Sequence, residues 1–234
     1  MDDGYEPARA VKNARELADK GAVAFVNLVG TGVLQALMPQ LDELNLPVFG
    51  MSSGADQLRA NQPGSRWLFH TKASYGDEFK GFASVLPTIG MSKLALVYQD
   101  NAFGKAGLES AKAAFAAAGV KTDIPPLLLG AGTEKADAVI AELKKTQPQA
   151  VVLVAAGAAA PEFIGRYQKA AGASARVAVL SVVGGKLLTD KLQSNAGGIM
   201  TSLVYPSPWS GARRVSREYQ AAMDKAQQPL SLLS

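Results

Sequence analysis

The chain alternates between short runs of consecutive apolar residues and longer amphipathic stretches, and this alternation constrains its fold more than any other feature. Two segments repeat one plan, because Lys93–Gly119 and Gln147–Gly172 each contain a strand-like run, a short loop, a helix-like stretch and a terminating glycine. Strand–helix units joined by short loops require right-handed crossovers and a mostly parallel sheet. The sequence therefore predicts a doubly wound α/β fold.

The apolar runs lack polar alternation, which is typical of strands covered on both faces. We expect strands at Val23–Leu28, Pro47–Met51, Trp67–Thr71, Leu94–Gln99, Ala150–Ala155, Val177–Val182 and Ile199–Val204. We expect helices at Pro7–Lys20, Val33–Leu44, Gly76–Ile89, Lys105–Ala118, Lys135–Thr146, Pro161–Ala171 and Ala212–Ala226. Ligands of doubly wound sheets bind beyond the carboxyl ends of the strands, so the loops at those ends are where function is sought.

Composition narrows the classes of function. The 234 residues contain no cysteine, which excludes disulfides, thiolate metal sites and cysteine nucleophiles. The net charge of +4 is dispersed, and the basic cluster Arg213, Arg214 and Arg217 is typical of a solvated helix face, so we expect no nucleic-acid partner. The apolar runs are too short to span a bilayer, and Met1–Tyr5 does not resemble a secretory signal, so no direct membrane insertion is expected.

Two loops carry groups suited to an anion. Gly30 and Thr31 follow the first predicted strand and open a helix, where free N–H groups and the helix dipole favour negative charge. Ser52, Ser53 and Gly54 follow the second strand and offer hydroxyl and backbone donors. A tight turn with a capping threonine, and serines that merely cap a helix, are the structural alternatives.

A dinucleotide-binding loop is the rival interpretation of the first loop. The pattern G-x-G-x-x-G fails, because Gln35 stands where the third glycine belongs, and no acidic residue ends the next strand. An α/β enzyme with a nucleotide-like cofactor stays as the alternative from another class. We predict no cofactor.

The remaining loops carry little chemistry. Phe103 precedes a glycine after the fourth predicted strand and is placed to cover a ligand or to pack on its own helix. The segments 156–160 and 182–185 have no ionisable or hydroxyl side chain, which predicts apolar walls. The single histidine, His70, lies in an apolar strand and is expected to be packed. We predict no catalytic residue, no metal site and hence no enzyme.

Several strings in this order resemble the leucine/isoleucine/valine-binding family of type I periplasmic solute-binding proteins. The strings are Asp2–Ala10, the Val-Gly-Thr loop, Leu46–Gly50, Thr71–Glu78 and Val97–Gly104. The resemblance implies two Rossmann-like lobes that close on a small carboxylate or amino-acid-like ligand, a periplasmic location, and a membrane permease of an ABC transporter as partner. It places the first lobe at 1–73, the second lobe at 74–204 and a return segment at 205–234. It also implies that the chain is truncated at both ends, so that the first lobe is incomplete and exposes sheet edges and apolar faces.

The resemblance also assigns residues. Gly30, Thr31, Ser52 and Ser53 match the first-lobe loops that hold a ligand carboxylate in the family, and Phe103 matches an aromatic that closes over the ligand. Tyr75, which lies in one of the matching strings, Gly54 of the loop after the second predicted strand, and Val183 complete the predicted binding set.

One departure bears on the ligand. Val183 occupies the position of an acidic residue that commonly pairs the ligand ammonium, and the aromatic wall expected near Ala159 and Ala160 is reduced to methyl groups. An ammonium left unpaired in a closed cleft costs several kcal/mol, so a carboxylate without an amine is the ligand we expect. A ligand-sensing receptor domain of the same fold is the nearest alternative function.

Overall fold

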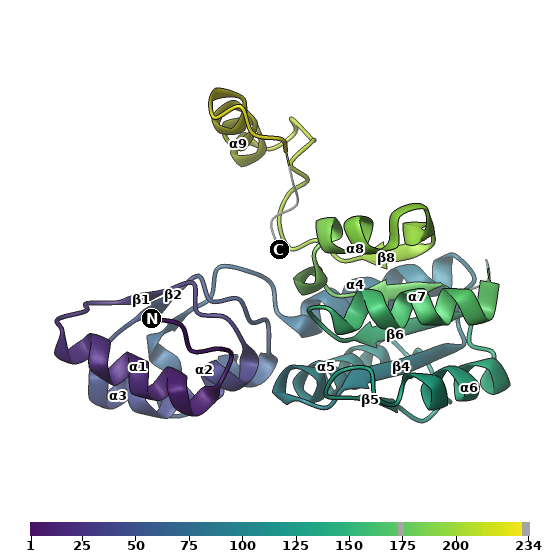
Figure 1. The fold of residues 1–234 in the computed structure, drawn as a ribbon, viewed down its shortest axis with the longest axis horizontal. Helices are drawn as coiled ribbons and strands as arrows, with labels where there is room; N and C mark the ends of the chain where they lie inside the picture. Colours follow the sequence, from purple (N-terminus) through teal and green to yellow (C-terminus); the bar gives the residue numbers. More distant parts are fainter. Residues whose placement is uncertain (173–175, 231–234) are drawn as a thin grey trace.

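The computed structural model describes residues 1–172 and 176–230, which form two parallel β-sheets of three and five strands (Figure 1). We call the part built on the three-stranded sheet the first lobe and the part built on the five-stranded sheet the second lobe. The chain is therefore a parallel α/β protein, as the alternating pattern predicts, and it has the two lobes that the family resemblance implies.

The first-lobe sheet has the order β1-β2-β3 and is covered on one face. In each strand the first residue is buried and the second is exposed, because successive side chains of a strand point to opposite faces. The strands are β1 (Phe25–Val26), β2 (Val48–Phe49) and β3 (Leu68–Phe69). The helical segments are α1 (Pro7–Asp19), α2 (Thr31–Leu37), η1 (Met38–Gln40), α3 (Leu41–Leu44), η2 (Asp56–Arg59) and η3 (Ser65–Trp67), where η denotes a 3-10 helix.

The second-lobe sheet has the order β5-β4-β6-β7-β8 with all pairs parallel. Its strands are β4 (Leu94–Gln99), β5 (Leu127–Gly130), β6 (Ala150–Val154), β7 (Val177–Val179) and β8 (Ile199–Thr201). Its helical segments are α4 (Tyr75–Thr88), α5 (Ala102–Ala117), α6 (Ala136–Thr146), α7 (Ala159–Ala171), η5 (Ser181–Val183), α8 (Gly185–Leu192) and η6 (Gln193–Ala196).

Helices cover both faces of this sheet. Leu96 and Val152 belong to a buried cluster with aromatic side chains of α4 and α5, such as Phe79 and Phe115. The alternating residues Val97 and Val151, with others of β6 and β7, belong to a second cluster with α6, α7 and α8. The first cluster also contains first-lobe residues from α2 and β1 to β3, so the two lobes share one continuous packed core.

The structure differs from the predicted elements in three places. The single helix expected over Val33–Leu44 is divided into α2, η1 and α3, because Pro39 has no N–H to continue an α-helix. Strand β5 and helix α8 had no predicted counterpart. Elsewhere the expected strands and helices are found, with several shortened at their ends.

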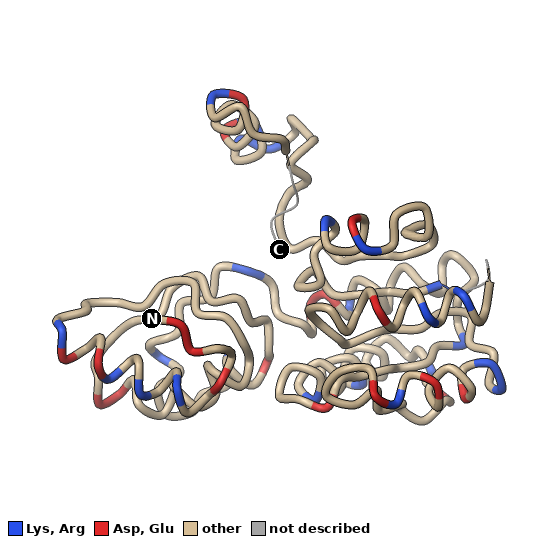
Figure 2. Tube along the Cα trace, in the orientation of Figure 1, with Lys and Arg blue, Asp and Glu red and all other residues tan. Residues whose placement is uncertain are grey.

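Helix α9 (Arg214–Lys225) follows β8 through an extended segment and lies apart from both sheets (Figure 1). Figure 2 shows basic and acidic residues interspersed along the outer helices of both lobes. Over the described ranges, no helix combines the length and hydropathy needed to cross a membrane.

Candidate functional site

The loops that follow β1 and β2 lie side by side at the carboxyl end of the first-lobe sheet. Val29 and Ser52 form a parallel bridge, and the Ser52 N–H donates to the Leu28 carbonyl oxygen at 2.8 Å. This pairing brings Thr31 Oγ1 within 2.9 Å of Ser53 Oγ. Thr31 is 1% exposed and Ser53 is 0% exposed, so their hydroxyls form a buried polar pair.

A glycine and an aromatic ring border this pair. Gly30 precedes α2 and has a φ of +111°, which is open mainly to glycine. A Cβ at Gly30 would lie 2.6 Å from Tyr5 Cε2, so the absence of a side chain allows the Tyr5 ring to pack on the loop. Tyr5 was not among the residues predicted from the sequence. The two positions meet only through the fold, so no local spacing connects them.

The second lobe meets these first-lobe loops with the first residues of α4 and α5. The Tyr75 N–H donates to the Gly54 carbonyl oxygen at 2.6 Å, and a Cβ at Gly54 would lie 2.7 Å from Tyr75 Cδ1. The Tyr75 ring meets the Phe103 ring edge to face, with centroids 5.4 Å apart. Both aromatic side chains are buried. Five of the predicted residues, Thr31, Ser53, Gly54, Tyr75 and Phe103, thus lie in one chain of contacts that crosses from lobe to lobe.

The Tyr75 phenol is held in its neutral form. Burial raises the pKa of Tyr75, and the nearby Glu78 carboxylate raises it further. Hydrogen bonds with the Gly54 backbone, Ser53 and Thr31 oppose this shift without reversing it. The centre of the seam therefore holds three uncharged hydroxyls, which can donate to a carboxylate without the like-charge repulsion that an ionised group would bring.

The lobes are in contact along this seam. A Cβ at Gly32 in α2 would lie only 3.3 Å from the Ala102 Cβ at the start of α5. The loops after β1 and β4 therefore face each other at close range.

Two cavities lie near the seam. One of about 60 Å³ is lined in part by Asn27, Ser52, Lys72 and Ser181. A second of about 550 Å³ shares Asn27 and Ser181 and extends towards α8, the segment after β8, and α9. Burial lowers the pKa of Lys72, while Glu78 raises it and Arg59 lowers it. Of the predicted binding residues, Ser52 lines the smaller cavity and is only half-buried.

The position matching the family's acidic residue lies elsewhere. Val183 is 2% exposed and packs in the core cluster under α7 and α8, whereas Val182 packs against the cluster that includes Tyr75 and Phe103. Ala159 and Ala160 are also buried. The structure therefore does not bring Val183 into the contact chain around Thr31, and the side chain of that loop on the seam side is Val182.

No cluster of potential metal ligands is found within residues 1–172 and 176–230. His70 lies outside the seam contacts described above. Burial and the nearby Arg59 lower the pKa of His70, so the ring is neutral at pH 7.

Two parallel α/β lobes whose strand-end loops meet across a seam are typical of two-lobed ligand-binding proteins. A family model described as periplasmic binding protein matches residues 1–234, and the chain belongs to that family. The members of this family are solute-binding proteins.

Solved structures share the fold. A possible leucine/isoleucine/valine-binding protein from Rhodopirellula baltica SH 1 has 26% identity and a TM-score of 0.86, covering 99% of this chain and 64% of that chain. A substrate-binding periplasmic protein from Ralstonia solanacearum has 27% identity and a TM-score of 0.83, covering 99% and 66%. A solute-binding protein from R. palustris in complex with benzoate has 19% identity and a TM-score of 0.79, covering 99% and 63%, and shows the fold alone.

The chain spans between 63% and 66% of the length of these three proteins. A search of curated protein sequences gives no match.

Proposed function

We propose that this chain is the ligand-binding part of an extracytoplasmic solute-binding component of an ABC-type importer, and that its ligand is a small carboxylate. The observation that carries the proposal is the buried group of hydroxyls from Thr31, Ser53 and Tyr75 at the junction of the lobes. Family membership supports the proposed location and the proposed permease partner.

The hydroxyl group suits a carboxylate for a physical reason. A carboxylate taken out of water needs several hydrogen-bond donors, and hydroxyl and backbone N–H donors supply charge-assisted bonds without a competing charge. In the closed seam Thr31 and Ser53 bond to each other. When the lobes separate, a ligand carboxylate would replace that bond, with Ser52 and the backbone around Gly30 and Gly54 as further donors.

The residues that the second lobe presents to the seam favour a ligand without an amine. The loop after β7 presents Val182 rather than an acid to the seam. Glu78, a buried carboxylate near Tyr75, accepts from the Ser181 N–H at 2.8 Å and from the Ser202 hydroxyl. It is thus engaged with the ends of β7 and β8.

One observation favours a second candidate, an amine-bearing ligand. The Glu78 Oε1 is buried and has no hydrogen-bond partner among the residues that the structure describes. An unpartnered buried carboxylate oxygen is a strong acceptor, so a ligand ammonium that reached Glu78 would bind there.

Calorimetric titration of the 234-residue chain with benzoate, leucine and valine separates these candidates. We expect benzoate to bind, and Thr31→Val to weaken its affinity by roughly 10- to 100-fold through loss of a hydrogen bond to a charged group. Thr189→Val, an exposed threonine on α8, is the matched control and leaves affinity unchanged. Tight binding of leucine but not benzoate, abolished by Glu78→Gln, would establish the second candidate instead. Equal affinity of Thr31→Val and wild type for benzoate would remove the proposed site.

The transport role has its own test. Cells lacking the gene are expected to lose uptake of the radiolabelled ligand found by titration, and the intact gene restores it. Unchanged uptake with an altered transcriptional response to the same ligand would assign the protein to ligand sensing.

A further inference from the structure

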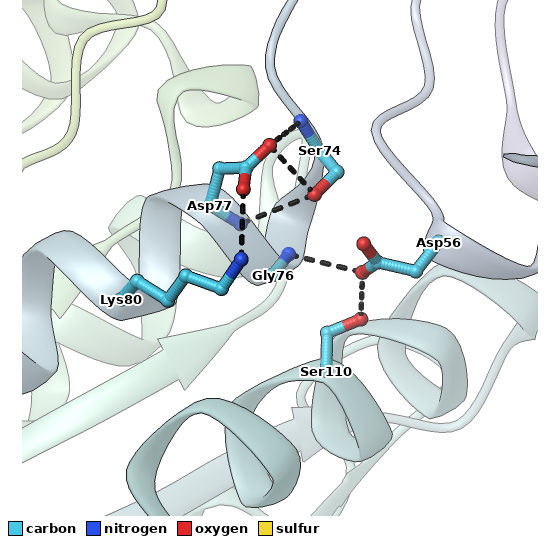
Figure 3. Close-up of polar contacts among 6 residues, drawn as sticks. All are labelled: Asp56, Ser74, Gly76, Asp77, Lys80 and Ser110. Atoms are coloured by element: carbon cyan, nitrogen blue, oxygen red, sulfur yellow. Dashed lines mark hydrogen bonds and ion pairs between the residues drawn. The ribbon is translucent and has the colours of Figure 1, made fainter. Parts of the chain in front are cut away.

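The first turn of α4 is capped from two directions at the junction of the lobes (Figure 3). Within the second lobe, Ser74 Oγ accepts from the Asp77 N–H at 3.1 Å and Asp77 Oδ2 accepts from the Ser74 N–H at 3.2 Å, which is a capping box. The Gly76 N–H lies outside this box. It donates to Asp56 Oδ2 at 3.0 Å, and Asp56 belongs to η2 of the first lobe.

The same Asp56 oxygen accepts a second bond from the second lobe. The Ser110 hydroxyl on α5 lies 2.5 Å from Asp56 Oδ2 and 3.0 Å from the Ala106 carbonyl oxygen. A hydroxyl has one proton, and the shorter contact to a charged acceptor is the stronger of the two. One carboxylate therefore ties η2 to both α4 and α5, as Figure 3 shows.

The local sequence accommodates this contact. A Cβ at Gly76 would lie 2.9 Å from Asp56 Oδ1, so glycine at that position allows the carboxylate to approach. The positive end of α4 also favours a negative group there. Lys80, the cation drawn in Figure 3, pairs with Asp77 Oδ1 at 3.1 Å and not with Asp56, so the Asp56 charge is directed to the two donors.

We propose that Asp56 is a positioning residue that acts as an interlobe latch and sets the balance between closed and open lobes. In the closed form its loss leaves the Gly76 N–H without its acceptor, and the Ser110 hydroxyl retains only the Ala106 carbonyl oxygen at 3.0 Å. In an open form water bonds to both groups, so the same loss costs little. Removing Asp56 therefore shifts the population towards the open form. The latch acts in the chain without ligand and does not depend on the proposed carboxylate.

The absence of cysteine allows a direct measurement. Cysteines placed at the exposed Lys12 of α1 and Lys144 of α6 take one spin label in each lobe, and pulsed dipolar spectroscopy gives the interlobe distance distribution. We expect one dominant distance in the otherwise wild-type chain and at least a fivefold lower closed-to-open ratio in Asp56→Ala. Asp56→Asn and Ser110→Ala should shift the ratio less but in the same direction. The double variant Asp56→Ala with Ser110→Ala should match Asp56→Ala alone, because Ser110 acts through Asp56.

Asp77→Ala is the matched control, since it weakens the cap of the same helix from within the second lobe. It should lower the urea midpoint without moving the interlobe distance. The latch is wrong if Asp56→Ala lowers the urea midpoint and leaves the distance distribution unchanged, or if Asp77→Ala shifts the distribution as much. Should Asp56→Ala not fold, Asp56→Asn and Ser110→Ala decide the question by the same comparison.

Discussion

Gly64 lies in the turn before η3, where it packs against the backbone of another element. It has a φ of +79°, and a Cβ there would lie 1.7 Å from the Met38 carbonyl oxygen. Its N–H donates to Asp42 Oδ2 at 2.8 Å, which fixes the turn against the start of α3. The neighbouring backbone leaves no room for any side chain, so a substitution has to move the turn itself.

We therefore expect Gly64→Ala to lower the free energy of unfolding by more than about 2 kcal/mol, since a left-handed alanine alone costs about 1–3 kcal/mol. Gly90→Ala is the matched control, because Gly90 has the same φ of +79° and a Cβ there would have no atom within 4 Å. Urea unfolding of both variants isolates the clash from the backbone strain. Equal losses in the two variants would contradict the role assigned to the Met38 contact.

The residues of the candidate site were predictable to different degrees. Thr31 and Ser53 stand in the loops that follow two apolar runs, and parallel strands bring such loops to one edge of a sheet, so the sequence alone indicated them. Tyr5 and the choice between Val182 and Val183 were not predictable. Both depend on side-chain direction and on the approach of distant segments, which local patterns do not determine.

At the scale of single elements, α4 offers the clearest case of a helix specified by its first turn. Ser74 and Asp77 form a reciprocal capping box, and the apolar face behind it buries Phe79 and Phe82. A lost serine cap typically costs about 0.5–2 kcal/mol, so Ser74→Ala should lower the free energy of unfolding by roughly 1 kcal/mol. Urea unfolding at pH 7 measures this loss, and an unchanged midpoint would show that the box contributes nothing to stability.

The same box should make stability depend on pH. The hydrogen bond from Lys80 and that from the Ser74 N–H lower the pKa of Asp77, and burial opposes this shift without reversing it. A carboxyl group whose folded pKa is depressed stabilises the protein above its unfolded pKa of about 3.9, and this stabilisation is lost as the pH falls through the lower folded value. Wild type should therefore lose more stability than Asp77→Asn between about pH 5 and pH 2.

Lys80→Met serves as the companion variant, because it removes the Lys80 ion pair and keeps the box. Between about pH 5 and pH 2, the stability lost by Lys80→Met should be smaller than the loss in wild type and closer to the loss in Asp77→Asn. Parallel pH profiles for wild type and Asp77→Asn would contradict the assignment.

Elements were predictable where local signals agreed and not where they conflicted. Strand β4 was predicted with its observed bounds because its run is apolar and buried throughout most of its length. Strand β5 follows Pro125 and Pro126, which are typical of a loop, and its pairing with β4 stabilises it as an edge strand. Helix α8 begins at Gly185 after Gly184, so no side-chain cap marks its start in the sequence. The packing of Leu188 and Leu192 in the second core cluster stabilises it instead.

At the scale of the whole molecule, the two faces of the first-lobe sheet are unequal. Phe25, Val48 and Leu68 are aligned across the sheet and buried under the helices. Their neighbours Val26, Phe49 and Phe69 are aligned on the opposite face and are 71%, 40% and 47% exposed. The Phe49 and Phe69 rings stack with centroids 4.9 Å apart. We call these three exposed residues the apolar stripe.

A stripe of this kind favours association, since a contiguous exposed apolar surface gains free energy when it is covered. We expect the 234-residue chain to self-associate at micromolar concentration, and Phe69→Thr to reduce the association several-fold, as measured by sedimentation velocity over a concentration series. Val85→Thr is the control, because Val85 is 51% exposed on α4 and does not belong to the stripe. A wild-type chain that stays monomeric over the whole series would contradict the prediction, and so would an equal effect of both substitutions. The Asp56 contacts lie at the seam, whereas the apolar stripe lies on the open face of the first-lobe sheet. Phe69→Thr should therefore leave the interlobe distance unchanged.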